Sequence, residues 1–180
     1  GLADVAGALP RALLGLGHDV RILMPKYRGI EAFAEALRPV VLGVRIPLAE
    51  REEAGVLWEG RPPAGVPTYF LAQDEYFDRE HLYSTADGDY PDNCERFTYF
   101  CRAGLEAIAQ LAVADTGREA WRPQIVHAND WQTGLVPVYL QTLYRGHPTL
   151  SSLATLFTIH NLAYQGVFWH YDMPMTGLGW

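Results

Sequence analysis

The sequence has few features that suit a membrane or an oxidising compartment. No apolar run reaches the ~18 residues that a membrane-spanning helix needs, and the 180 residues include two cysteines, Cys94 and Cys101. Both fall on one predicted helix, where a seven-residue separation places their Cα atoms about 10.5 Å apart. A disulfide spans at most about 7 Å between Cα atoms. We therefore expect two reduced thiols, which fits a cytoplasmic location.

Positive charge is also scarce. Lys and Arg total 14 against 21 Asp and Glu, the formal net charge is −7, and Lys26 is the only lysine. A nucleic-acid interface needs clustered Lys and Arg, so we expect neither a nucleic-acid nor a membrane partner. A P-loop, a GxGxxG fingerprint and a GxSxG elbow are all missing. The hydrophobic fraction of 49% is that of a globular chain and excludes a disordered one.

Hydrophobic periodicity predicts an alternation of strands and helices. We expect strands at 19–24, 38–46, 54–58, 67–71, 124–126 and 153–159, and helices over 2–16, after an N-cap at Asp92, and over 131–145. The buried stripe of the second helix should consist of Phe97, Cys101, Leu105, Ile108 and Ala112. Residues 60–65 should form a turn and residues 77–91 a long loop. The near-continuous apolar character of 153–159 predicts burial on both faces. This order indicates an α/β fold with a mostly parallel sheet and flanking helices.

Two of the predicted strands end in polar clusters. One is followed by His127-Ala-Asn-Asp130-Trp131, and the next by His160-Asn161, with the two histidines 33 residues apart. Ligands of open parallel sheets bind at the carboxyl ends of the strands, so we expect both clusters at one rim. Carboxylate, imidazole and amide groups beside an indole face suit a polyhydroxylated ligand.

Each of these residues also has a purely structural explanation. Asp130 could cap a helix that starts at Trp131, Trp131 could be a packing residue, and His160 could be a core histidine with a satisfied partner. Residues 1–4 open a helix whose amides could receive a phosphate or could form a frayed end. His127, Asp130 and His160 are of types that bind zinc, but neither HExxH nor paired CxxC spacing is present, so we expect no metal.

Three long segments stand out: residues 1–13 (GLADVAGALPRAL), 127–135 (HANDWQTGL) and 158–166 (TIHNLAYQG). They resemble motifs of the bacterial glycogen synthases and plant starch synthases. They stand in the family's order and span nearly the whole chain. The resemblance implies the N-terminal, Rossmann-like half of a two-domain GT-B glycosyltransferase. Such an enzyme transfers glucose from ADP-glucose, sometimes UDP-glucose, to the non-reducing end of an α-1,4-glucan, with retention of configuration and without a metal or other cofactor.

The resemblance also implies roles for single residues. His160, supported by Asn161, would be catalytic, contacting the reacting glucose and stabilising an oxocarbenium-like transition state. Gly1 and Asp4 would bind the donor, Asp130, Trp131 and Tyr90 the acceptor, and His127 would shape the rim.

The chain departs from the family pattern at its start. The family's first motif reads Lys-x-Gly-Gly-Leu-Ala-Asp, and this chain enters at the second of these glycines. The family's donor-binding lysine and the central strand before it are therefore missing. Lys26, the only lysine, follows another strand and cannot take the place of that lysine. We expect residues 1–180 to be a single partial N-terminal domain whose partner in cis is a C-terminal domain. Alone it should be inactive and, with unpaired strand edges, only marginally stable.

Three other functions remain open from the sequence. A GT-B transferase of the sucrose or trehalose type would keep the fold, although the HNLAYQG run argues against it. A non-catalytic glucan-binding module would need Trp131 and Tyr90 without a donor site. A metal hydrolase would use His127, Asp130 and His160.

Overall fold

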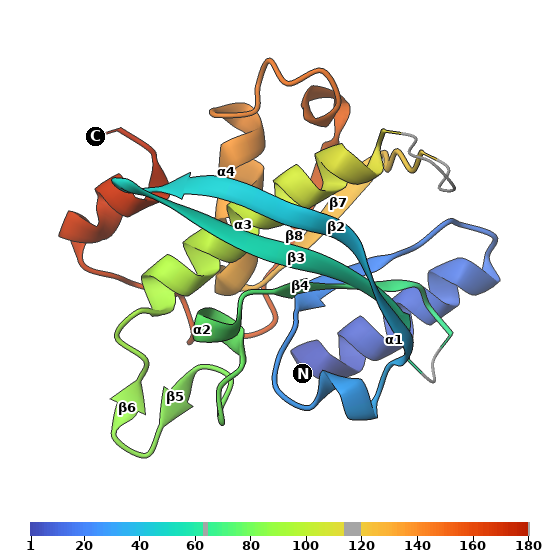
Figure 1. The fold of residues 1–180 in the computed structure, drawn as a ribbon, viewed down its shortest axis with the longest axis horizontal. Helices are drawn as coiled ribbons and strands as arrows, with labels where there is room; N and C mark the ends of the chain where they lie inside the picture. Colours follow the sequence, from blue (N-terminus) through green and yellow to red (C-terminus); the bar gives the residue numbers. More distant parts are fainter. Residues whose placement is uncertain (63–64, 114–119, 180) are drawn as a thin grey trace. The chain divides into compact units, whose positions relative to one another are not determined.

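The computed structural model describes residues 1–62, 65–113 and 120–179. Figure 1 shows its helices and strands, coloured along the chain. The helices are α1 (Leu2–Gly15), α2 (Asp74–Phe77), α3 (Asn93–Leu111) and α4 (Leu135–Gln141), and the strands are β1 (Ile22–Pro25), β2 (Glu35–Leu48), β3 (Arg51–Arg61), β4 (Thr68–Ala72), β5 (Ser84–Thr85), β6 (Gly88–Asp89), β7 (Ile125–Asn129) and β8 (Ala154–Thr158). Short 3₁₀ helices cover Ile30–Ala32, Trp131–Thr133, Leu150–Ser152 and His170–Thr176. The alternation confirms the α/β class.

The chain forms two compact units. The first contains Gly1–Val44 and Ala54–Asn93, and the second contains Arg45–Glu53 and Cys94–Trp180. The long strands β2 and β3 contribute to both units, because their connecting end, Arg45–Glu53, belongs to the second.

A sheet in the order β1-β4-β3-β2 is the centre of the first unit. Strand β1 pairs with β4 in parallel, whereas β3 pairs with β4 antiparallel, so the sheet is mixed. Its core includes Leu57, Phe70, Leu71 and Phe77, each at most 1% exposed. By contrast, α1, which lies wholly within the described residues, has no buried residue. The first unit therefore buries its sheet much more completely than its first helix.

Helix α3 lies at the centre of the second unit's hydrophobic core. The predicted stripe is confirmed, since Phe97, Cys101, Leu105, Ile108 and Ala112 are all buried. Most of these side chains pack in one cluster with Ala128 of β7, with Tyr139 and Leu140 of α4, and with Leu150 and Leu153. The two thiols are free, as predicted, although Cys94 is only half-buried.

Two predicted segments differ from the observed elements. The predicted loop 77–91 contains the β5–β6 hairpin, where Gly88 with φ +125° allows the reversal of the chain. The predicted helix 131–145 is a 3₁₀ turn followed by the shorter α4. Pro137 is tolerated because it lies in the first turn of α4, where backbone N–H groups have no partner within the helix. Part of the predicted turn at 60–65 lies outside the described residues.

The prediction that strand 153–159 is buried on both faces is wrong. Residues 154–157 of β8 are exposed, with Leu156 at 52% and Phe157 at 40%. Among the described residues, β8 pairs with β7 alone. Apolar composition predicts which residues favour burial, but the number of neighbouring strands decides whether they are buried.

Candidate functional site

The rim of the second unit is formed by the ends of β7 and β8. These strands run parallel, with Ile125 opposite Ala154 and Asn129 opposite Thr158. Their carboxyl ends therefore lie side by side, and the two polar clusters meet as predicted. Five side chains build the contact between them: His127 and Asn129 on β7, Asp130 just after it, Thr158 at the end of β8, and His160 two residues later.

Asp130 joins the two strand ends. Its backbone N–H donates to the carbonyl oxygen of Thr158 (2.8 Å), and its Oδ1 accepts from the backbone N–H of His160 (2.6 Å). The backbone of Asp130 has φ +58° and ψ 179°, a conformation that costs a residue other than glycine about 1–3 kcal/mol. The helix-cap explanation is wrong, because the carboxylate makes no capping bond and binds His160 instead.

The two histidines of the rim each have a polar partner on the opposite strand. Nε2 of His160 lies 2.9 Å from Oδ1 of Asn129, and Nε2 of His127 lies 2.7 Å from the hydroxyl oxygen of Thr158. Burial, and secondarily the nearby His160, lower the pKa of His127. A neutral ring is therefore favoured at His127, which can donate or accept one hydrogen bond at Nε2.

The Trp131 ring packs against the loop that follows His160. It meets Phe97 and Phe168 edge to face, with ring centroids 5.0 and 5.6 Å away. Gly166 has φ +60°, and a Cβ added there would lie 2.5 Å from Cε3 of Trp131. The tryptophan thus needs a glycine at this point, which supports the packing explanation for part of its ring. Its ring also lines an open, mainly apolar cavity of about 490 Å³, together with Gln132, Phe168 and Trp169.

Asn161 lies on the exposed start of the same loop. Its Oδ1 accepts from the backbone N–H of Ala163 (3.0 Å), which forms a local turn. The amide therefore shapes the loop immediately after His160.

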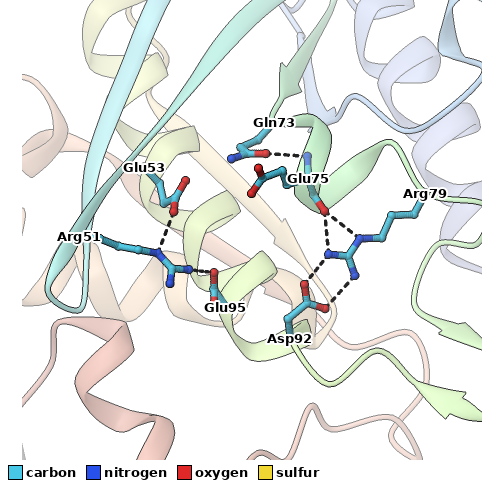
Figure 2. Close-up of polar contacts among 7 residues, drawn as sticks. All are labelled: Arg51, Glu53, Gln73, Glu75, Arg79, Asp92 and Glu95. Atoms are coloured by element: carbon cyan, nitrogen blue, oxygen red, sulfur yellow. Dashed lines mark hydrogen bonds and ion pairs between the residues drawn. The ribbon is translucent and has the colours of Figure 1, made fainter.

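The remaining predicted site residues belong to the first unit. Gly1 and Asp4 lie at the start of α1, where the backbone N–H of Asp4 donates to the carbonyl oxygen of Gly1 (3.1 Å) and the Asp4 side chain is exposed. The Arg79 guanidinium lies 4.8 Å from the centre of the Tyr90 ring. Figure 2 shows the same arginine binding the carboxylate of Asp92, with Nη1 2.9 Å from Oδ1, and the backbone oxygen of Glu75. The predicted N-cap residue Asp92 thus anchors the segment that carries Tyr90.

The sequence placed Asn129 within the first polar cluster but indicated no role for it, and it indicated none for Thr158. Both are polar residues at the last position of a strand, next to residues that were singled out. That signal could have found them, because neighbouring parallel strands place their last residues opposite one another. It could not have shown which of them contacts which histidine.

The described residues include no group of three or more His, Cys, Asp and Glu side chains placed to hold a metal ion. The metal-hydrolase alternative gains no support, since His127 and His160 contact Thr158 and Asn129 through Nε2. Within the same part of the chain, no helix is both long and apolar enough to cross a membrane.

The second unit is thus an α/β arrangement with a polar rim at the carboxyl ends of two parallel strands. A family model described as the starch synthase catalytic domain matches residues 1–180, and the chain belongs to this family. It is 48% identical to a glycogen synthase of Syntrophotalea carbinolica over 93% of the chain and 33% of that protein. It is 45% identical to one of Anaeromyxobacter sp., over all of the chain and 35% of that protein.

The fold resembles a solved structure of the same family. The catalytic domain of starch synthase IV from Arabidopsis thaliana, bound to ADP and acarbose, superposes with a TM-score of 0.81 and 31% identity. The match covers 99% of this chain and 34% of that one. The chain thus spans about a third of the length of the relatives it matches.

Proposed function

We propose that the protein containing this chain is a retaining glucosyltransferase that extends an α-1,4-glucan at its non-reducing end with glucose from ADP-glucose. The observation that carries this proposal is the His160 arrangement. The imidazole stands at the carboxyl ends of two parallel strands, fixed through Asn129 and Asp130, within a chain that the starch synthase family matches throughout. ADP and acarbose in the Arabidopsis relative support a nucleotide-sugar donor and a glucan acceptor.

In this proposal the rim of the second unit holds the reacting sugar. His160 contacts the glucose, and its preset dipole stabilises the charge that develops in the transition state. Asn161 supports it by shaping the loop. Asp130 and Trp131 lie on the acceptor side, and His127 completes the rim.

The other expected roles belong to residues of the first unit. Backbone N–H groups at the start of the 14-residue helix α1 favour anions, so Gly1 would meet the donor phosphates and Asp4 the donor sugar. Tyr90 would contribute to acceptor binding. A C-terminal GT-B domain in cis would supply most contacts to the nucleotide, and we expect the enzyme to work in the cytoplasm.

Replacing His160 tests the proposal. In the full-length protein, His160→Ala should lower kcat for glucose transfer from ADP-glucose to glycogen by roughly 10²–10³-fold, the usual cost of removing one transition-state dipole. Circular dichroism should show an intact fold. His18→Ala is the matched control, because His18 is exposed and outside the proposed site.

Two results would contradict the proposal. Near-normal turnover of the His160 variant would remove that residue from the active site. Binding of maltooligosaccharides by the full-length protein without binding or transfer from ADP-glucose would favour the glucan-binding module instead.

A further inference from the structure

Asn129, the last residue of β7, lies between two histidines of the rim. Its Nδ2 donates to the backbone carbonyl oxygen of His127 (3.2 Å), and its Oδ1 lies 2.9 Å from Nε2 of His160. The residue is half-buried, so these contacts are partly shielded from water.

These two contacts determine which nitrogen of His160 carries the proton. The carbonyl oxygen of His127 can only accept, so the NH₂ group of Asn129 must face it. The amide oxygen therefore faces His160 and, because it too can only accept, Nε2 of the neutral ring must donate. Nδ1 is then left with a lone pair, and among the described residues no hydrogen bond is made to it.

The backbone of His160 is held without help from Asn129. Its N–H donates to Oδ1 of Asp130 at 2.6 Å. Removing the Asn129 amide would therefore release the ring while the backbone at position 160 stays in place. The other titratable groups at this rim are His127, whose Nε2 meets Thr158, and the Asp130 carboxylate.

We infer that Asn129 is a positioning residue for the proposed glucosyl transfer. It holds the His160 ring in the Nε2–H tautomer and thereby keeps Nδ1 as an acceptor for a hydroxyl group of the bound sugar. The identity of the sugar rests on the proposed function, whereas the protonation of the ring follows from the hydrogen bonds alone.

Two substitutions in the full-length protein test this role through kinetics. Asn129→Leu has a similar volume but no acceptor, so kcat should fall by roughly 10²-fold, as expected for a misplaced reacting group. KM should change far less. Asn129→Asp keeps an acceptor oxygen and should retain more activity than the leucine variant. Gln141→Leu, at the exposed end of α4, is the control.

Nitrogen NMR of the full-length protein labelled with ¹⁵N-histidine reads the tautomer directly. The His160 signals, assigned by their loss in His160→Ala, should show a protonated Nε2 and a bare Nδ1, and Asn129→Leu should lose this preference. A protonated Nδ1 in the unmodified protein would overturn the inference. So would an unchanged tautomer and kcat in Asn129→Leu. If Nε2 of His160 carries a proton that depends on Asn129, but the protein transfers no glucose, the proposed function is overturned. The positioning of the ring by Asn129 would then still stand.

Discussion

The two units hold their candidate residues in different ways. In the second unit, Asn129, Asp130 and His160 bond to one another across two strand ends, and Asp130 adopts a costly backbone conformation to do so. In the first unit, the Asp4 side chain in the first turn of α1 is 89% exposed. The rim of the second unit is therefore already organised by contacts between distant residues, whereas the Asp4 carboxylate of the first unit lies exposed to solvent.

Replacing one glycine in each unit, Gly166 in the second and Gly17 in the first, tests this difference and should give the largest effect. Gly166 and Gly17 both have positive φ, +60° and +89°. A Cβ added at Gly166 would lie 2.5 Å from the Trp131 ring, whereas a Cβ added at Gly17 would have no other atom within 4 Å. Gly166→Ala should destabilise the protein by about 2–4 kcal/mol, from overpacking and backbone strain together. Gly17→Ala should cost about 1 kcal/mol from strain alone. Urea denaturation of both variants measures the two values, and equal losses would show that the Trp131 contact is unimportant.

Within the first unit, the segment before Tyr90 is held more firmly than the start of α1, since Arg79 binds Asp92 and the backbone of Glu75 while partly buried. Figure 2 shows both contacts. Arg79→Ala should cost about 1 kcal/mol and speed amide hydrogen exchange in the β5–β6 segment before Tyr90. Arg28, whose ion pair with Asp78 is exposed on both sides, is the control, because such pairs contribute little. Exchange rates that match those of Arg28→Ala would place the segment among the loosely held parts.

His127 should give the smallest effect. Its pKa is lowered in the folded state, so the folded protein binds fewer protons than the unfolded chain once the pH falls below about 6.5. The protein should therefore lose stability on acidification, and His127→Gln should lose less. Urea denaturation at a pH above and a pH below that value measures the difference. His18→Gln, at an exposed position of the first unit, should behave like the unmodified protein.

Much of the fold could be predicted because its signals are local. The stripe of α3 repeats every three or four residues, and all five of its predicted members are buried. The strands before His127 and His160 are found from their apolar runs. Their parallel pairing at one rim follows from the intervening helix. The β5–β6 hairpin escaped prediction because its strands have two residues each, too few to show a period.

The contacts within the candidate site could be predicted only in part. Both polar clusters were found, but the bonds of Asp130 to the backbone of His160 and of Asn129 to its ring join residues about 30 positions apart. Register decides such contacts, and no local pattern in the sequence reports register. Likewise, the sequence placed Asp92 directly before α3, where the structure has it, but did not indicate that its carboxylate binds Arg79, 13 positions away.

The α/β class, the free thiols and the convergence of two polar clusters could be inferred from residue order, because they depend on periodicity, spacing and residue chemistry. The exposure of β8, the close packing of Gly166 against Trp131 and the contact of Asn129 with the His160 ring could be seen only in the folded chain. These depend on which strands become neighbours and in what register. That outcome reflects the packing of the whole chain rather than the preference of any one segment.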